Sequence, residues 1–390
     1  MPMITTLANR IAALSDGLRQ TCERIFHVAT MTGYTDPPAT MEAWIVRHFG
    51  TVDAVREQTI VRVVNRLTLE GALFNPLRAR RPTESVGDDA ALESRIAATL
   101  AGVDDFRDPL RDTTADLFGR IRGRFCVTAS NVAKYDGWHG LVIFDEPHPL
   151  RFDQARLSDY LDVAFRWIAA AYAHDDQAIY PIITWNCLPK SGATLMHGHM
   201  QLALARGMPY ARVETWRRAA ETYRTQHSAS YFNDLFAIHQ ALGLAIPQSA
   251  RQRVFAHLTP IRNREVVFLA NLEDIGQADK QTSRQAEVRA DERSLSPDLF
   301  VSLSQRLADA LYPILRNLID KQGMRAFNLA ITPPPLHVTA EDWGDFPTLA
   351  RLADRGDPLA TSSDIGAIEL FATGCVTADP FEVAAALSTN

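Results

Sequence analysis

The chain has 390 residues, which is enough for two ordinary domains or for one large fold built from two halves. Its composition, 46% hydrophobic and 22% charged, is typical of a globular protein and excludes a disordered or collagen-like chain. The net charge of -6 provides no general attraction for nucleic acid or acidic membranes, although it leaves room for a local basic pocket.

The cysteines and the apolar runs indicate the cellular compartment of the protein. The four cysteines form no Cys-x-x-Cys pair, which fits neither a disulfide framework nor a cysteine-rich zinc site. They are Cys22, Cys126, Cys187 and Cys375. The first residues, MPMITTLANRIAALSDG, lack the apolar core of an export signal, and no later apolar run approaches the roughly 18 residues of a membrane span. We therefore expect a cytoplasmic protein that has neither a membrane nor a nucleic-acid partner.

The N-terminal part of the chain is predicted to be mostly helical. Residues 1–72 place apolar side chains such as Ile11, Leu14 and Leu18 three and four positions apart. The segment that follows, FNPLRARRPTESVGDD, contains Asn-Pro and Arg-Pro steps, which disfavour helix. We expect an extended connector between this helical extension and the rest of the chain.

The middle of the chain is predicted to alternate strands and helix. Two apolar runs, around residues 125–127 and 141–144, indicate strands joined by a segment that contains Gly, Asp and Asn. Residues 153–173 carry apolar side chains at helical spacing, which indicates an amphipathic helix against a sheet. Two short strands, IYPIITWNC and HMQLALA, are expected next.

The last part of the chain repeats this coarse order. Residues 207–244 are predicted to be helical, and REVVFLANL at 264–272 to be a strand. The polar run at 277–294 has charges of alternating sign, which indicates a solvated helix or loop rather than a nucleic-acid patch. A helix with Pro313 inside it is expected after Ser296, and a terminal helix after Asp379. The pattern strand, helix, strand therefore occurs twice and indicates two related halves.

One motif carries chemistry. The segment SGATLMHGHMQ ends with His197, Gly198, His199, Met200 and Gln201. The two histidines and the glutamine occupy alternate positions of an apolar run. In a strand, side chains alternate between the two faces, so the two histidines and the glutamine would share one face. We expect these three polar groups to converge on one site.

A turn precedes this motif. The segment NCLPKSGAT supplies Asn186, Lys190, Ser191, Gly192 and Thr194. Its glycine allows close approach of the backbone, and its hydroxyls and amides can donate hydrogen bonds to phosphate oxygens. We predict a phosphate-binding turn beside the histidine pair.

These residue types suit nucleotidyl transfer. A neutral imidazole, with an ordinary pKa of about 6.5, is a nucleophile at neutral pH and can be held in one tautomer by a hydrogen bond to its other nitrogen. Its attack on an α-phosphorus would divide the transfer into two in-line displacements. Gln201 cannot titrate, so it could donate to a non-bridging oxygen without acting as an acid or a base. Two imidazoles on one strand face could also bind a metal, but no further ligand follows at a suitable spacing.

The motif resembles the active-site sequence of the histidine-triad superfamily, in the nucleotidyltransferase branch that has glutamine at the last position. That branch includes galactose-1-phosphate uridylyltransferase, diadenosine tetraphosphate phosphorylase and the GDP-hexose phosphorylases. The S-G-A-S/T-x-x-H-x-H-x-Q spacing matches throughout, and Asn186 stands where those enzymes have an asparagine before the glycine turn. The resemblance implies that His199 is the nucleotidylated residue and that His197 supports the phosphate environment.

A second segment is similar to the part of the family that helps to hold the nucleoside. In TASNVAKYDGWHGLVIFDEPH, an asparagine precedes a histidine, an apolar strand and a second histidine. The resemblance implies a nucleoside-binding role for this segment. Its members here are Asn131, His139 and His148.

Two further segments are similar to substrate-binding parts of the uridylyltransferases. FNPLRARRP matches an Asn-Pro followed by arginines near the substrate phosphates, which makes Arg78 and Arg81 candidates. An arginine cluster in a connector is also commonly only solvated. SSDIGAIELFATGCV is similar to a strand before the final helix, so Glu369 is a candidate to face the acceptor, although a buried or cross-strand glutamate fits the pattern as well.

The resemblance implies an α+β fold, in which two histidine-triad-like halves form an extended, largely antiparallel sheet flanked by helices. We predict a helical N-terminal extension and connector at 1–82, a first half with the active site at 83–225 and a second half at 226–390. Three features depart from the uridylyltransferases. Gly198 replaces their usual proline, no counterpart of their zinc ligands is found, and the second half has no paired histidines, only His337.

We expect a ping-pong nucleotidyltransferase or phosphorylase that acts on a nucleotide sugar or a dinucleoside polyphosphate. Its expected partners are the nucleotide and a phosphate or sugar phosphate acceptor, and a homodimer is left open. No cofactor is required, although Mg²⁺ could accompany the nucleotide. The alternatives are galactose-1-phosphate uridylyltransferase proper, a nucleotide hydrolase, a nucleotide-binding protein without turnover and a metal-dependent enzyme. Gln201 argues against the hydrolase, because a histidine at that position would favour it.

Overall fold

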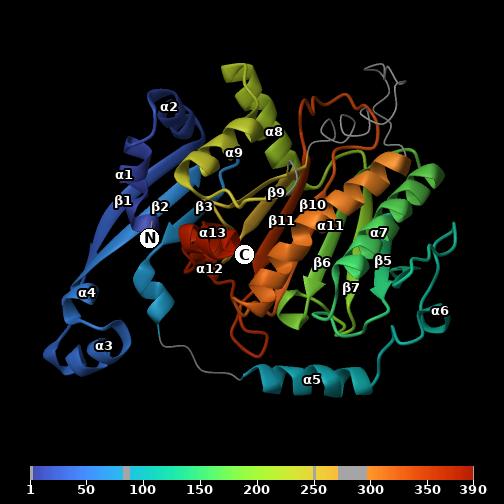
Figure 1. The fold of residues 1–390 in the computed structure, drawn as a ribbon, viewed down its shortest axis with the longest axis horizontal. Coiled ribbons are helices and arrows are strands. Elements are labelled where there is room, and N and C mark those ends of the chain that lie inside the picture. Colours follow the sequence, from blue (N-terminus) through green and yellow to red (C-terminus); the bar gives the residue numbers. More distant parts are fainter. Residues whose placement is uncertain (1–2, 82–87, 249–251, 271–296, 390) are drawn as a thin grey trace.

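The computed structural model describes residues 3–81, 88–248, 252–270 and 297–389. The polar run predicted at 277–294 lies outside these residues. The described part of the chain forms two sheets with helices packed around them (Figure 1). The predicted α+β class is confirmed.

The larger sheet has eight strands in the order β4-β5-β7-β6-β10-β11-β9-β8, and each neighbouring pair is antiparallel. Its strands are β4 (Cys126–Ser130), β5 (Trp138–Phe144), β6 (Ala178–Cys187), β7 (His199–Arg206), β8 (Arg253–Ala256), β9 (Val266–Ala270), β10 (Phe327–Thr332) and β11 (Thr348–Asp354). The strands predicted from the apolar runs of the middle and last parts of the chain are all present.

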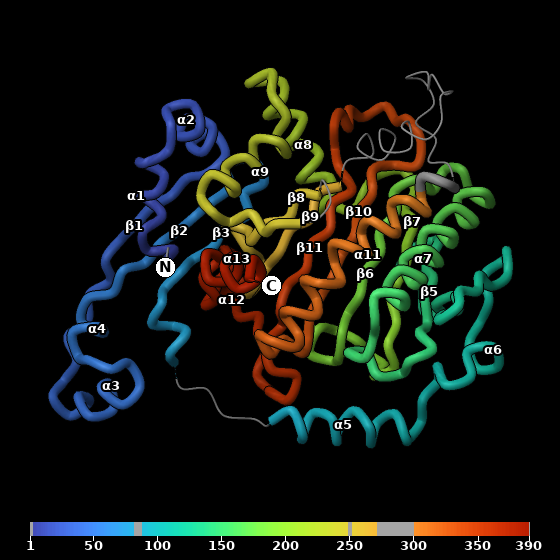
Figure 2. The backbone as a smooth tube through the Cα atoms, in the orientation of Figure 1, coloured from blue at the N-terminus to red at the C-terminus, as the bar shows by residue number. Residues whose placement is uncertain are grey.

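The sheet consists of two halves with the same connectivity. In the first half β4, β5, a helix, β6 and β7 follow one another along the chain, and in the second half β8, β9, a helix, β10 and β11 do so. Strands β6 and β10 pair at the centre, so the order β4-β5-β7-β6 is repeated from the opposite edge as β8-β9-β11-β10. Figure 2 traces both paths. The predicted division of the fold into two related halves is confirmed.

One row of paired residues crosses all eight strands. In order, it consists of Ala129, Leu141, Gln201, Thr184, Ala330, Arg351, Val267 and Phe255. From either edge, the row passes through the corresponding strands of one half in the same order, β4-β5-β7-β6 or β8-β9-β11-β10. Gln201 of β7 and Arg351 of β11 therefore occupy equivalent places in the two halves.

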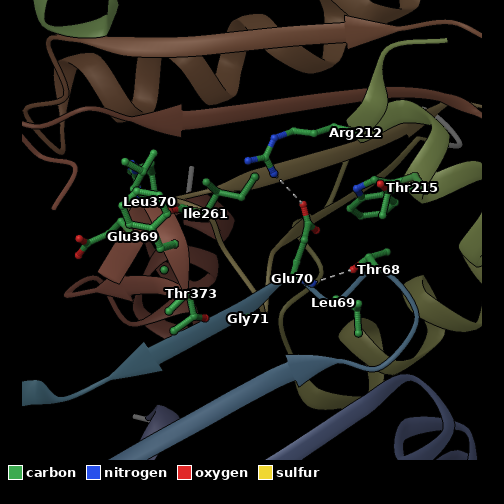
Figure 3. Close-up of a pocket in the computed structure, with 15 residues that line it drawn as sticks. Thr68, Leu69, Glu70, Gly71, Arg212, Thr215, Ile261, Glu369, Leu370 and Thr373 are labelled. Atoms are coloured by element: carbon green, nitrogen blue, oxygen red, sulfur yellow. Dashed lines mark hydrogen bonds and ion pairs between the residues drawn. The ribbon is translucent and has the colours of Figure 1, made fainter. Parts of the chain in front are cut away.

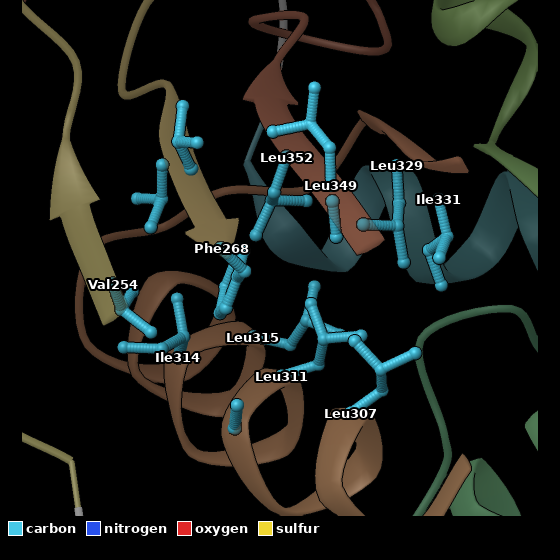
Figure 4. Packing of buried hydrophobic residues seen from close by; sticks show 14 of the residues in the cluster. Val254, Phe268, Leu307, Leu311, Ile314, Leu315, Leu329, Ile331, Leu349 and Leu352 are labelled. Atoms are coloured by element: carbon cyan, nitrogen blue, oxygen red, sulfur yellow. The ribbon is translucent and has the colours of Figure 1, made fainter. Parts of the chain in front are cut away.

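Two long helices cover one face of this sheet. They are α7 (Gln154–His174) and α11 (Pro297–Asp320), and they lie side by side (Figure 1). Helix α7 is the helix predicted at 153–173, and the side chain of Asp153 accepts the N–H of Arg156 at its start, at 2.8 Å. Pro313 lies inside α11, as predicted. Figure 4 shows Leu307, Leu311 and Leu315 of α11 among the buried side chains of the sheet.

The alternation along β7 places the motif on the face that these helices do not cover. Met200 and Leu202 are buried in the core that contains α7 and α11. His199 and Gln201 alternate with them and so point to the opposite face. The expected common face for His199 and Gln201 is therefore present.

The smaller sheet has four strands in the order β1-β2-β3-β12, and only the β3–β12 pair is parallel. Its strands are β1 (Phe26–Tyr34), β2 (Glu57–Asn65), β3 (Gly71–Phe74) and β12 (Gly374–Val376). The predicted helical extension contains helices α1 (Leu7–Ala12), α2 (Asp16–Ile25), α3 (Glu42–Phe49) and α4 (Val52–Arg56). The prediction missed the three strands of this segment. In β2, Val61 and Val63 are buried and Arg62 is exposed, which is the alternation of a half-buried strand.

Shorter elements complete the described chain. They are η1 (Ile4–Thr6), η2 (Ala39–Met41), η3 (Pro76–Arg80), η4 (Pro189–Ser191), α5 (Asp89–Ala101), α6 (Pro109–Asp112), α8 (Ala211–His227), α9 (Tyr231–Leu242), α12 (Ala367–Phe371) and α13 (Pro380–Ser388). Helix α13 is the predicted terminal helix, and Asp379 accepts the N–H of Phe381 at 2.9 Å. The domain boundaries at residues 82 and 225 remain a proposal, and the second of them falls in the last turn of α8.

Candidate active site

His199 begins β7, and its imidazole is fixed by a backbone group. Nδ1 donates a hydrogen bond to the carbonyl oxygen of His197 at 2.8 Å. With the proton on Nδ1, the lone pair of the neutral ring lies on Nε2, and none of the described residues hydrogen-bonds to that atom. Burial lowers the pKa of His199, the hydrogen bond to the carbonyl partly opposes this, and the charge of His197 lowers the pKa further. The ring is therefore neutral and has a free lone pair at neutral pH.

His197 lies just before the strand and differs from the expectation. Its Nδ1 is 2.9 Å from Oδ2 of Asp104, and its Nε2 donates to the carbonyl oxygen of Phe144 at 2.9 Å. Both ring nitrogens are therefore occupied by protein atoms. The prediction that His197 shares an open strand face with His199 and Gln201 is corrected, because the chain reaches its strand conformation only at His199.

Gly198 is required by a close approach. A Cβ at this position would lie 2.6 Å from Cδ2 of Phe144 and 3.3 Å from Cα of Pro149. The ring of Phe144 is stacked on Tyr160, with 3.8 Å between ring centroids, so it cannot easily move away. The N–H of Gly198 also donates to the carbonyl oxygen of Pro147 at 2.9 Å, a bond that proline cannot make. These contacts explain why glycine stands where the uridylyltransferases have proline.

Gln201 is oriented by a second polar chain on the same face. Nδ1 of His139 accepts the N–H of Tyr135 at 3.3 Å, which places the proton of a neutral ring on Nε2. That nitrogen donates to Oε1 of Gln201 at 3.2 Å; Nδ2 of Asn131 also lies 3.2 Å from it, but both nitrogens then carry protons, so Asn131 takes no part in this bond. Burial lowers the pKa of His139 and so favours the neutral ring. With its oxygen engaged by His139, Gln201 has an NH₂ group to which no described residue hydrogen-bonds, so it can donate.

The turn before the motif differs from the predicted phosphate cradle. Gly192 has φ +97°, a left-handed conformation that favours glycine. The Ser191 hydroxyl lies 2.7 Å from the carbonyl oxygen of Cys187, and the N–H groups of residues 191–193 donate to carbonyl oxygens within the turn. These donors are therefore used to build the turn. The exposed Thr194 keeps its hydroxyl without a partner among the described residues.

Asn186 and Lys190 are also engaged by the second half. Oδ1 of Asn186 accepts a hydrogen bond from the side chain of Asn328 on β10 at 2.7 Å. Nζ of Lys190 donates to the carbonyl oxygens of Ala360, at 3.3 Å, and of Ser362. The strand and the turn that precede the motif are thus held against the second half of the fold.

Three predicted residues lie away from the histidine pair. Arg78 and Arg81 follow β3 of the smaller sheet, and no hydrogen bond or ion pair among the described residues joins them to the motif. Glu369, expected on a strand, lies on α12, where it accepts the N–H of Gly366 at 2.9 Å. The structure therefore does not bring these three residues into the site.

His148 lies between Pro147 and Pro149, which both contact Gly198. Its own Nε2 is 3.2 Å from Glu93 of α5.

Glu369 instead lines a separate cavity of about 280 Å³. Figure 3 shows Glu70 and Arg212 pointing toward each other across it, with 3.9 Å between their charged atoms. Arg351, whose side chain is 15% exposed, donates to Glu70 at 2.6 Å. This cavity is lined by the end of the smaller sheet, by α8 and by residues of the second half.

Two other general features concern metals and membranes. Within the described ranges, no group of three or more His, Cys, Asp or Glu side chains is arranged to hold a metal ion. No helix in the same ranges has the length and apolar character needed to cross a bilayer.

Comparisons with known proteins support the fold. No family model matches the chain, and no curated protein matches it in sequence. Among solved structures, an ADP-glucose phosphorylase from Arabidopsis thaliana with bound ADP-glucose matches with a TM-score of 0.59 and 14% identity, over 84% of this chain and 98% of that one. A GalT-like protein from Arabidopsis thaliana matches with a TM-score of 0.55 and 15% identity, over 74% and 92%. A uridylyltransferase matches with a TM-score of 0.53 and 15% identity, over 71% and 87%.

These likenesses define the class of fold. The chain shares its fold with these three proteins, which agrees with the fold that the motif predicted. The proteins that it resembles in structure include an ADP-glucose phosphorylase and a uridylyltransferase.

Proposed function

We propose that this chain is a nucleotidyltransferase that works through a covalent nucleotidyl intermediate on His199. The observation that carries the proposal is the hydrogen bond of 2.8 Å from Nδ1 of His199 to the carbonyl oxygen of His197. It fixes the tautomer whose free lone pair is on Nε2, which is the arrangement that a nucleophilic imidazole needs. The lowered pKa of His199 keeps this nucleophile unprotonated at neutral pH.

The transfer takes place in two displacements. In the first, Nε2 of His199 attacks the α-phosphorus of the nucleotide, a P–N bond forms, and the P–O bond to the leaving sugar phosphate or nucleotide breaks with its electron pair on oxygen. In the second, an oxygen of the acceptor attacks the same phosphorus and the P–N bond breaks, which restores the neutral imidazole. The substrate is a nucleotide sugar or a dinucleoside polyphosphate, and the acceptor is phosphate or a sugar phosphate.

Gln201 stabilises the charge on the phosphoryl group in this proposal. Its NH₂ group is free to donate because His139 holds its oxygen at 3.2 Å. Gln201 and His199 lie on the same face of β7, so a phosphorus at Nε2 has its non-bridging oxygens near this donor. His139 orients the glutamine rather than the substrate.

Fewer residues of the turn contact the phosphate in this proposal than the sequence predicted. Thr194 supplies a hydroxyl, and Lys190 supplies positive charge from an ammonium group that has one donor left after its two carbonyl partners. Asn186, Ser191 and Gly192 shape the turn. Arg78, Arg81 and Glu369 are not part of the proposed site.

Covalent trapping tests the proposal. The purified chain is incubated with nucleoside diphosphate sugars and dinucleoside polyphosphates, and the peptide that contains His199 is examined by mass spectrometry for an acid-labile nucleotidyl group. His199→Asn should abolish the label, whereas His337→Asn in the second half should keep it. With phosphate present, the label should disappear as nucleoside diphosphate forms. If release of product occurs without any label on His199, the chain is a hydrolase or acts by direct transfer.

A further inference from the structure

The loop between α5 and α6 brings two side chains onto the histidine pair. Oδ2 of Asp104 lies 2.9 Å from Nδ1 of His197. The ring of Phe106 meets the ring of His199 edge to face, with 5.2 Å between ring centroids and 77° between ring planes. Oδ1 of Asp104 also accepts the N–H of Phe106 at 3.1 Å, so one carboxylate holds both the histidine and the residue that covers the nucleophile.

This ion pair is buried, which is unusual for a surface loop. The side chains of Asp104 and His197 are 6% and 5% exposed. Taking a carboxylate out of water is unfavourable unless it is paired and hydrogen-bonded. The two partners are 93 residues apart in the chain, so the pair fixes the loop to the site rather than to its own neighbours.

The contacts of His197 determine where its protons are. Nε2 faces the carbonyl oxygen of Phe144, which only accepts, so this nitrogen carries a proton. Nδ1 faces the carboxylate of Asp104, which also accepts when it is ionised. Both ring nitrogens of His197 therefore face acceptors, and the backbone carbonyl of that same His197 accepts the hydrogen bond from Nδ1 of His199.

We propose that Asp104 is a positioning residue for the transfer: it fixes His197, whose carbonyl orients His199, and it keeps Phe106 over the ring of His199. This inference rests on the proposed function. A cover of this kind excludes water from the nucleotidyl-histidine, which a transferase needs because water would otherwise hydrolyse the intermediate. Phe106 packs with Ala129, Leu141 and Ile143 on the same face, so the cover is anchored on the sheet.

Other charged groups lie around the same place: Arg107, Arg122, Arg124 and Asp145 line a cavity of about 290 Å³ that reaches His197. The carboxylate of Asp104 lies 2.9 Å from Nδ1 of His197 and so favours a proton on that nitrogen. The charge of His197 is one of the causes that lower the pKa of His199. An amide in place of the carboxylate removes the support for that charge, so in Asp104→Asn we expect the pKa of His199 to rise toward its ordinary value.

The test compares two neighbouring aspartates. The rate of His199 labelling is measured in single turnover between pH 5 and pH 9 for the wild type, for Asp104→Asn and for Asp105→Asn, whose side chain is exposed. We expect labelling of Asp104→Asn to be slower by about ten- to a hundredfold, the usual effect of losing a partner that orients an imidazole. Its acid limb should also move to higher pH, and Asp105→Asn should match the wild type. Equal rates and equal pH profiles for the two variants would overturn the proposal.

Side-chain NMR of the wild type keeps the proposal testable if Asp104→Asn does not fold. The ¹⁵N shifts of the histidines should show a proton on Nδ1 of His197, hydrogen-bonded to Asp104, and a proton on Nδ1 alone of His199. A His197 ring whose Nδ1 carries no proton would overturn the proposal. Failure of the proposed function can be told apart from failure of the Asp104 proposal. If no nucleotide labels the wild type, the proposed function is refuted. If the wild type and Asp104→Asn are labelled alike, the role of Asp104 is refuted.

Discussion

Gln201 of β7 and Arg351 of β11 occupy equivalent places in the two halves of the larger sheet. Each of these residues has a polar partner two positions before its paired residue on the neighbouring strand, and the two partners differ. Gln201 lies 3.2 Å from His139, whereas Arg351 donates to Glu265 at 2.6 Å. Two residues before Arg351 the second half has Leu349, where the first half has its proposed nucleophile. The second half thus has the same strand arrangement, but an ion pair between Arg351 and Glu265 in place of the glutamine and its histidine partner.

Arg351 is therefore expected to be structural. Its guanidinium joins Glu265 to Glu70 of the smaller sheet, with 2.6 Å to each carboxylate. Arg351→Ala takes the guanidinium away from the buried Glu265 and from Glu70, which keeps only Arg212 at 3.9 Å, so the free energy of unfolding should fall by about 3–5 kcal/mol. Urea unfolding followed by circular dichroism measures the change.

Arg212 supplies the matched control. It approaches the same Glu70 at 3.9 Å, but its side chain is 75% exposed. An exposed ion pair contributes little, so Arg212→Ala should change the free energy of unfolding by less than about 1 kcal/mol. If the two variants are equally stable, the buried network does not hold the smaller sheet to the second half.

Gly198→Ala should destabilise the protein and slow labelling of His199. The new Cβ would lie 2.6 Å from the ring of Phe144, which is stacked on Tyr160, so the backbone between the histidines has to shift. Overpacking of this kind costs about 1–3 kcal/mol, which thermal unfolding can measure.

Relief of the same clash checks the cause. In the double variant Gly198→Ala with Phe144→Val, the loss of stability should be smaller than the sum of the two single losses. Gly17→Ala is the control, because nothing lies within 4 Å of a Cβ there, and it should be neutral or slightly stabilising. Additive losses in the double variant would contradict the proposed clash.

Gln201→Glu should slow the first displacement. A carboxylate cannot donate to a phosphoryl oxygen, and its charge repels the α-phosphate, so single-turnover labelling of His199 should fall by about 10²–10³-fold. Thr184→Val changes a neighbour in the same row of the sheet and should have a much smaller effect. A Gln201→Glu variant that labels at the wild-type rate would remove Gln201 from the site.

His239 should make the stability of the protein depend on pH. Burial, and then the charge of His257, lower the pKa of His239 to about 3, and its Nε2 accepts the N–H of Leu258 at 3.2 Å. Above the ordinary pKa of about 6.5 the ring is neutral in both states and has no effect. As the pH falls below that value only the unfolded chain takes up the proton, so stability falls by up to about 1.4 kcal/mol per pH unit until the folded pKa is reached.

A variant separates this contribution from those of other groups. His239→Gln has no titrating ring, so its free energy of unfolding in urea should vary less between pH 7 and pH 4 than that of the wild type. An unchanged pH dependence would show that His239 does not carry it.

The central part of the site was predictable because it is local in sequence. The spacing of His199 and Gln201 predicts a shared strand face, and the structure provides it. The repeated strand–helix–strand order predicts two halves in the same way. The spacing of apolar side chains in a strand or a helix involves residues that are close together in the chain, so one sequence is enough to recognise it.

The rest depends on contacts that sequence spacing does not encode. Asp104 reaches His197 across 93 residues, and nothing near it in the chain marks it as a partner of the motif. Ser191 has the residue type of a phosphate ligand, but its hydroxyl is used inside the turn. In the N-terminal segment, apolar residues such as Ile60, Val63 and Val64 fit a helical spacing as well as a strand, and pairing of β2 with β1 and β3 decides between them.

The most direct measurement is the intact mass of the chain after incubation with each candidate nucleotide in the absence of an acceptor. The account predicts the addition of one nucleotidyl group per chain, located on His199, lost in His199→Asn and removed by phosphate or a sugar phosphate. The single addition follows from Leu349 and Arg351 in the second half. Turnover of a nucleotide with the mass of the chain unchanged, or with the label on another residue, would contradict the account.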